Sequence, residues 1–145
     1  MDRTTFEAIR DLPGKTIAGQ IRFSQRQALA PVLVAEGIGI TSSEGIQLVL
    51  NISYNPMSGA KTFNVHVPGV GPICRLDVDG PAHRPAGRSH KHSVQGERCP
   101  GRNLPGGVID RPDLGGRTLA EVFEEFCTMA KITCTATLEF PDETQ

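Results

Sequence analysis

The feature that most constrains the fold is a pair of alternating segments joined by a short turn. Apolar residues occupy every second position from Ile46 to Ile52 and again from Phe63 to Val67. A period of two is typical of strands that bury one face. Between these segments, residues 55–59 read Asn-Pro-Met-Ser-Gly, a run of turn-forming residue types. The sequence therefore predicts a β-hairpin, and the short connection requires antiparallel pairing.

Other segments extend this hairpin into a sheet. Four of them carry a strand pattern, namely residues 17–23, 32–35, 73–78 and 133–140. The connections around the hairpin are short, so the middle of the chain is predicted to form an antiparallel meander. We expect this sheet to span residues 16–79 and to be completed by the closing strand at 133–140.

Two helices are predicted beside the sheet. Thr118 is followed three residues later by Glu121, which is the spacing of a capping box. Six apolar residues then recur at helical spacing on one face: Leu119, Val122, Phe123, Phe126, Cys127 and Ala130. This predicts a main helix over residues 118–132 that packs on the sheet, and a similar Thr-x-x-Glu start predicts a short helix over 4–12. The expected architecture is one α+β domain covering residues 1–145.

Residues 80–117 are predicted to form a long Gly/Pro/Arg-rich loop. Residues 83–117 include seven basic side chains and three acidic ones, whereas residues from 118 onward include six acidic side chains and one lysine. This basic loop either pairs with the acidic helix inside the fold or binds a partner. In the second case the partner-binding residues are Arg84, Arg88, Lys91, Arg98 and Arg102.

Three of the four histidines fall in the same loop, at His83, His90 and His92. Neutral imidazole is a common zinc ligand, and Asp79 or Cys99 would complete such a site. The spacing follows no standard zinc motif, so the alternative is that these histidines bond loop carbonyls or face solvent. No cofactor is predicted unless the histidines converge, in which case it is zinc. His66 falls on the polar side of its strand and is read as a surface residue.

Composition narrows the functional classes. The net charge is −1, so the protein as a whole does not attract polyanions. Aromatic residues make up only 5% of the chain, so it has few side chains on which the bases of a single-stranded nucleic acid could stack. No apolar run reaches membrane-spanning length and no signal-peptide pattern is present, so we expect a cytoplasmic protein with reduced thiols. Cys74, Cys127 and Cys134 lie in patterned segments and are expected in the core, and Cys99 is expected to be exposed.

Part of the chain resembles an uncharacterised family of small bacterial and phage-associated proteins. The resemblance rests on Leu76-Asp77-Val78-Asp79-Gly80 followed by His83, on the His-x-His pair at 90–92, and on the later helix with Phe126-Cys127. It covers residues 45–133. It implies the order of the fold elements and a role for the three histidines, and it implies no particular reaction.

These observations lead to one main functional hypothesis and two alternatives. The main hypothesis is a small, non-enzymatic inhibitor or adaptor that binds a protein or protein complex, for example an anti-defence (anti-CRISPR-like) protein of a phage or mobile element. One alternative is a metal-dependent hydrolase or nuclease that uses the histidine cluster. The other is a nucleic-acid-binding protein that uses the basic loop. A membrane partner is not expected.

Overall fold

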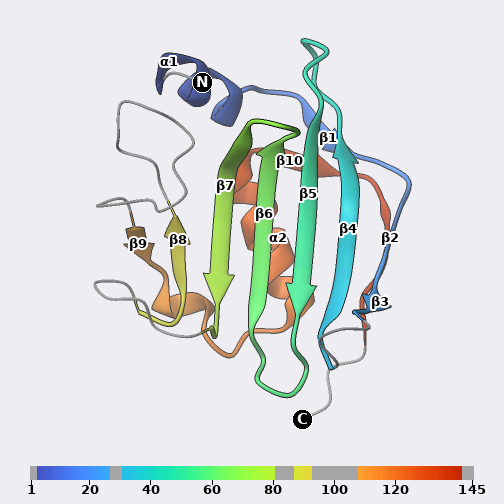
Figure 1. Ribbon diagram of the computed structural model, residues 1–145, viewed down its shortest axis with the longest axis vertical. Helices are drawn as coiled ribbons and strands as arrows, with labels where there is room; N and C mark the ends of the chain where they lie inside the picture. The colour runs from blue at the N-terminus through green and yellow to red at the C-terminus, as the bar shows by residue number, and fades with distance from the viewer. Residues whose placement is uncertain (1–2, 27–30, 81–86, 93–107, 142–145) are drawn as a thin grey trace.

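A computed structural model describes residues 3–26, 31–80, 87–92 and 108–141. In this part of the chain, seven strands form one antiparallel sheet in which every strand pairs with its sequence neighbours (Figure 1). The strands are β3 (Ser24–Gln25), β4 (Leu33–Ile40), β5 (Leu48–Tyr54), β6 (Lys61–Val67), β7 (Gly71–Val78), β8 (His90–His92) and β9 (Val108–Asp110). The predicted α+β class and the antiparallel meander are confirmed.

The central hairpin forms as its alternation predicts. Tyr54 pairs with Lys61, and the turn between them is held by the Asn55 side chain, whose Oδ1 accepts hydrogen bonds from the backbone N–H groups of Met57 and Ser58 at 3.0 and 3.3 Å. Gly59 closes the turn with a φ of 82°, a conformation that costs glycine little. The turn residues thus set the register that places alternate side chains of β5 and β6 in the core.

The main helix, α2 (Leu119–Ala130), carries the predicted caps and the predicted face. Glu121 N–H donates to Thr118 Oγ1 at 3.2 Å, and Thr118 N–H donates back to the Glu121 carboxylate, so the capping box is confirmed. The helix ends because Lys131 adopts a left-handed conformation, with φ 57°, from which its N–H bonds the last carbonyls. All six apolar residues of the predicted face are buried.

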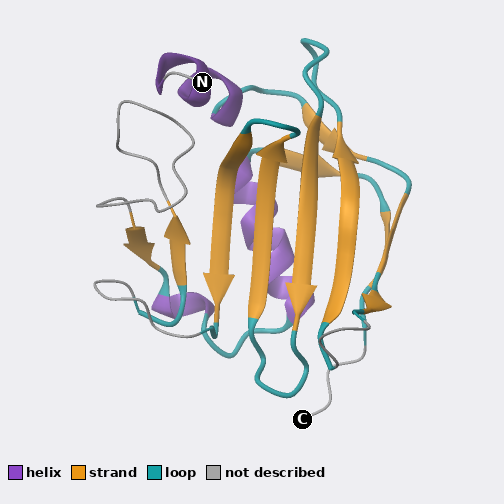
Figure 2. Cartoon of the chain, viewed as in Figure 1, coloured by secondary structure: helices purple, strands orange, loops and turns teal. Residues whose placement is uncertain are grey.

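The core lies between α2 and one face of the sheet (Figure 2). Phe63 of β6 stacks on Phe126 of α2 with ring centroids 5.2 Å apart, and the ring centroid of Phe123 lies 6.3 Å from that of Phe63. The short helix α1 (Arg3–Arg10) lies near one end of β7 and buries Phe6 and Ile9. No described helix is long and apolar enough to cross a membrane.

The two ends of the chain pair differently from the prediction. The expected strand at 17–23 divides at Gly19 into β1 (Lys15–Ile17) and β2 (Gln20–Arg22). The expected closing strand divides into β10 (Ile132–Cys134) and β11 (Thr137–Glu139). β1 pairs with β10 and β2 with β11, both in parallel and outside the main sheet. Parallel pairing needs a long connection, which nearly the whole chain provides here.

The prediction of an unbroken loop over 80–117 also needs correction. Two short strands in this range, β8 and β9, extend the sheet beyond β7, and a 3₁₀-helix, η2 (Pro112–Leu114), follows them. Neither strand has a clear apolar alternation of its own. β8 forms by pairing with the edge of β7, and β9 forms by pairing with β8. These are tertiary contacts that a local pattern does not encode.

The cysteines give a first prediction. Cys74 and Cys127 are buried and Cys134 is half-buried, as expected for core residues. Burial, followed by the nearby Cys134 and Glu124, raises the pKa of the Cys127 thiol to about 12. Because the thiolate is the reactive form, Cys127 should resist a thiol-alkylating reagent at pH 8 in the native protein and react after unfolding. Peptide mass spectrometry would measure this, and rapid native labelling of Cys127 would contradict the packing of α2.

Candidate functional site

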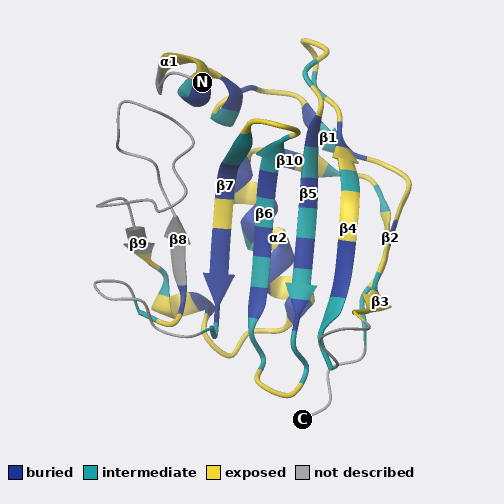
Figure 3. Ribbon diagram, viewed as in Figure 1, coloured by how far each residue is buried: buried dark blue, intermediate teal, exposed yellow. Residues whose placement is uncertain are grey.

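The two faces of the sheet differ in what covers them. α2 and the core cover one face, while no described element crosses the other, which faces the viewer in Figure 1. Along β5 and β6, buried residues alternate with half-buried ones (Figure 3). The uncovered side, called here the open face, carries eight residues of β5, β6 and β7: Val49, Asn51, Ser53, Thr62, Asn64, His66, Arg75 and Asp77. Apart from Val49, all of these side chains can form hydrogen bonds, so the open face is mainly polar.

These residues form rows across the strands. Ser53, Thr62 and Asp77 share one row, and Thr62 Oγ1 donates to Asp77 Oδ1 at 2.9 Å. In the next row Arg75 lies opposite Asn64, and its Nε donates to Asp77 Oδ2 at 3.3 Å. Arg75 and Asp77 neutralise each other, so this part of the open face presents polar groups with little net charge.

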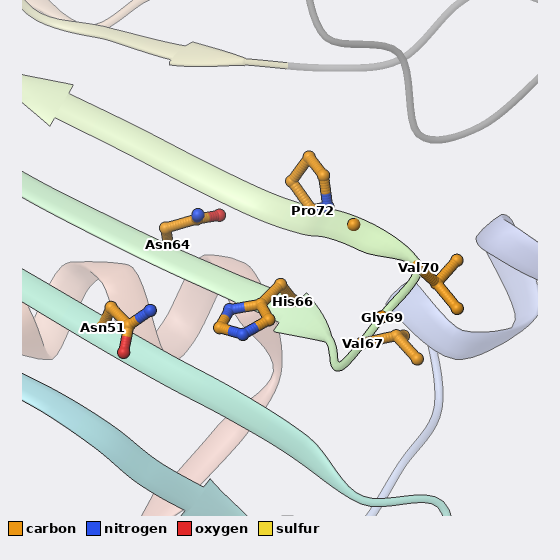
Figure 4. Close-up of a pocket in the computed structure, with 8 residues that line it drawn as sticks. Asn51, Asn64, His66, Val67, Gly69, Val70 and Pro72 are labelled. Carbon is orange, nitrogen blue, oxygen red and sulfur yellow. The ribbon is translucent and has the colours of Figure 1, made fainter.

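The open face contains a hollow of about 420 Å³ at the end of β6 (Figure 4). Asn51, Asn64 and His66 supply its polar groups, and the β6–β7 turn over residues 67–72 forms its rim. That rim is apolar, and Val70 at the turn is 48% exposed. The volume lies within the range of about 300–1,000 Å³ that is usual for small-ligand sites.

Two polar atoms of residues that line this hollow are buried and have no hydrogen-bond partner among the described residues. They are Asn64 Oδ1, which is an acceptor, and His66 Nδ1, which accepts or donates according to the tautomer of the ring. A buried polar atom without a hydrogen bond costs about 1–3 kcal/mol, so such atoms are rare unless something else satisfies them. Asn51 is different, because its Oδ1 accepts from Gly37 N–H at 2.9 Å in the bulge of β4. This bond leaves the Asn51 amide nitrogen as the donor on the side of His66 (Figure 4).

A second, smaller hollow of about 280 Å³ lies where β7 ends, beside Asp79, Arg88 and Asp110. Asp79 has a φ of 55° and connects several segments. Its carboxylate accepts from Gly116 N–H at 2.9 Å and lies 3.5 Å from the ammonium of Lys61, which is 3% exposed. The backbone N–H of Asp79 donates to Ser89 Oγ at 3.0 Å. Asp79 therefore joins β7, the start of β8 and the entry to α2.

The predicted partner-binding residues are placed in part. Arg88 is exposed, and its guanidinium donates to the carbonyls of Asp79 and Gly80 at 3.3 and 3.2 Å. Lys91 lies on β8. Arg84, Arg98 and Arg102 lie outside the described residues. The same holds for His83 and Cys99 of the proposed metal site.

The remaining metal candidates are His90, His92 and Asp79. His90 and His92 stand two residues apart on β8, opposite Asp77 and Arg75 of β7, and His90 also pairs with Asp110 of β9. The described residues contain no group of three or more side chains able to hold a metal ion. The zinc site thus stays a prediction. Its candidate ligand Asp79 already bonds Gly116 and lies beside the ammonium of Lys61.

Arg111 makes the expected link between the basic segment and the acidic helix. Its guanidinium bonds Asp113 and, on α2, Glu125, each at 3.0 Å. These two hydrogen bonds, that to Asp113 first, raise the pKa of Arg111 above its usual value. One basic side chain of the segment is therefore neutralised inside the fold.

The hollow on the open face is the feature that sequence reasoning missed. His66 was expected to be an ordinary surface residue, and it does lie on the polar side of β6, but its Nδ1 is buried. The sequence feature that could have indicated this hollow is the set of amide and imidazole side chains, Asn51, Asn64 and His66, at alternating polar positions of the hairpin. Comparisons of the chain with family models, with curated proteins and with solved structures found no match. The resemblance noted in the sequence therefore stays a prediction.

Proposed function

We propose that this protein is a non-enzymatic binding protein, an inhibitor or adaptor, that recognises a partner protein through the open face of its sheet. The observation that carries this proposal is the set of uncovered polar side chains on β5, β6 and β7, beside the hollow at the end of β6. Interfaces of transient complexes combine such polar groups with a small apolar element. Val70 and Pro72 supply that element here.

The basic residues in the segment 80–117 favour a partner with an acidic surface. β8 and β9 extend the sheet, and their paired ends, His92 and Val108, are joined by residues 93–107, which include Arg98 and Arg102. In the sequence, these arginines thus lie between the two strands that extend the sheet beyond β7. Charge complementarity of this kind raises association rates and selects partners.

A protein partner fits this surface better than a nucleic acid does. Base recognition on an open sheet uses aromatic side chains as stacking platforms, and the eight residues of the open face include no Phe, Tyr or Trp. Its arginine, Arg75, is already paired with Asp77. The described part of the face therefore offers little to phosphates.

Binding measurements with surface variants test the proposal. The partner would first be captured from a lysate, identified and purified. Replacing Arg84, Arg88 and Arg98 together with alanine should then lower its affinity by about tenfold or more, because the change removes positive charges that complement an acidic partner. Replacing Arg75 with alanine should also lower the affinity, because it removes an exposed polar side chain from the open face. Arg75 and Arg88 are exposed, and substitutions at exposed positions usually change stability by about 0.5 kcal/mol or less, so melting temperatures should stay close to wild type.

A matched control removes the same charge elsewhere. Arg22 and Arg26 lie in exposed ion pairs with Glu139 and Glu36, away from the open face. Their replacement by alanine should leave affinity unchanged. The proposal fails if the control weakens binding as much as the open-face variants do. It fails equally if the captured material is nucleic acid whose binding declines steeply with salt.

A further inference from the structure

The hollow at the end of β6 has an apolar rim that faces solvent (Figure 4). Val67, Val70 and Pro72 lie on this rim, and Val70 is 48% exposed. Gly69 and Gly71, with φ of 75° and 141°, flank Val70 and allow the tight turn that carries it. An exposed valine at this place gains stability from contact with an apolar group, because the contact removes its surface from water.

The polar groups that a ligand can reach in the hollow are mainly hydrogen-bond donors. Asn64 Oδ1 and His66 Nδ1 are buried and therefore out of reach, and Asn51 Oδ1 is already bonded to a backbone N–H. Within the described residues nothing accepts from the amide nitrogens of Asn51 and Asn64, and neither nitrogen is buried. None of the residues that line the hollow is Lys, Arg, Asp or Glu. The hollow therefore suits an uncharged group with an apolar body and a hydrogen-bond acceptor.

We propose that the hollow binds a tyrosine side chain presented by the partner protein. The aromatic ring packs against Val70 and Pro72, and the hydroxyl oxygen accepts a hydrogen bond from the amide of Asn51. Tyrosine is a frequent anchor residue of protein interfaces, since it buries a large apolar surface and keeps a polar tip. The hollow of about 420 Å³ is large enough for a small molecule, and therefore for one phenol ring.

Other side chains match this hollow less well. Phenylalanine and leucine would pack on the rim, but they would cover the amide donors without accepting from them, which costs free energy. A carboxylate accepts from an amide, but it would lose hydration with no Lys or Arg among the lining residues to compensate. An ammonium or guanidinium group brings only donors toward groups that are themselves donors.

The assignment to a partner's side chain rests on the proposed function, but binding of the group is measured without the partner. The full chain, labelled with ¹⁵N and with ¹³C in its methyl groups, would be titrated with p-cresol, which is the tyrosine side chain. p-Cresol should shift the methyl signals of Val67 and Val70 and the side-chain amide signal of Asn51 in a saturable way. Toluene, which lacks the hydroxyl, should bind about tenfold more weakly, and acetate should cause no such shifts.

A pair of variants in two turns sharpens this measurement. Val70→Asp should weaken p-cresol binding by about tenfold or more, because it places a charge on the apolar rim. Met57→Asp is the matched control, since Met57 is also an exposed apolar residue but lies in the turn between β5 and β6. It should bind p-cresol like the wild type. Both positions are exposed, so both variants should keep the wild-type melting temperature.

The outcomes separate this inference from the proposed function. Saturable p-cresol binding, together with weaker binding of p-cresol and of the partner by Val70→Asp but not by Met57→Asp, supports the tyrosine site. Absent shifts, equal affinities for p-cresol and toluene, or tighter binding of acetate overturn the inference, even if Arg75→Ala still weakens the partner complex and the proposed function stands. If p-cresol binds but Val70→Asp binds the partner normally, the assignment to a side chain of the partner is wrong.

Discussion

Replacing Phe126 with alanine is expected to lower the free energy of unfolding by about 3 to 5 kcal/mol, the usual cost of removing a buried phenylalanine. Phe126 is fully buried and stacks on Phe63, so it joins α2 to the middle of the sheet. Alanine is the best helix former, which means that the loss would come from packing and the cavity left behind. Denaturant unfolding followed by circular dichroism would measure it.

A substitution of an exposed apolar residue serves as the control for Phe126→Ala. Met57, in the turn of the hairpin, is 83% exposed, and its replacement by alanine should change the free energy of unfolding by about 0.5 kcal/mol or less. A loss of less than about 1 kcal/mol for Phe126→Ala would show that α2 does not close the core as described.

Replacing Asp79 with alanine is expected to cost about 3 kcal/mol, because it leaves the buried Lys61 ammonium without its counter-charge. The change also removes the acceptor for Gly116 N–H and places alanine at a φ of 55°. Asp79→Asn keeps an acceptor and tolerates this backbone conformation, so it should cost less. Thermal and denaturant unfolding of both variants would measure the difference.

A double variant separates the ion pair from the other contacts of Asp79. Lys61→Met removes the buried charge, so the further change Asp79→Ala should cost clearly less in that background than in the wild type. Equal costs in the two backgrounds would mean that the ion pair contributes nothing. A wild-type stability for Asp79→Ala, combined with a metal that is lost on the same change, would instead return Asp79 to the role of metal ligand.

Local patterns predicted the elements that have a clear side-chain period and clear ends. The alternation of the hairpin defined β5 and β6, and the capping box together with the apolar face of Leu119–Ala130 defined α2. In each case the side-chain period, the turn residues and the caps agree with one another. Such agreement favours one conformation for the segment, which packing in the core then stabilises.

The candidate site was predicted less well. The sequence indicated charged and metal-ligating side chains as the site. Of these, Asp79 bonds the backbone of Gly116 and pairs with the buried Lys61, and Arg88 bonds the backbone of Gly80. It gave no sign that Asn64 and His66 line one hollow, or that each buries a polar atom that has no partner among the described residues. Whether a polar atom is satisfied depends on the neighbouring strands and turns, and a period of two says only which face the residue occupies.

Periodicity and capping within short segments are enough to predict the α+β class, the antiparallel meander and the face of α2 that enters the core. The remaining strand pairs depend on contacts between distant segments. These contacts pair β1 with β10 and β2 with β11 in parallel, and they add β8 to the edge of β7 and β9 to β8. These short strands have too few residues to fold alone, so they form only where distant backbone groups offer hydrogen bonds that their own segments lack.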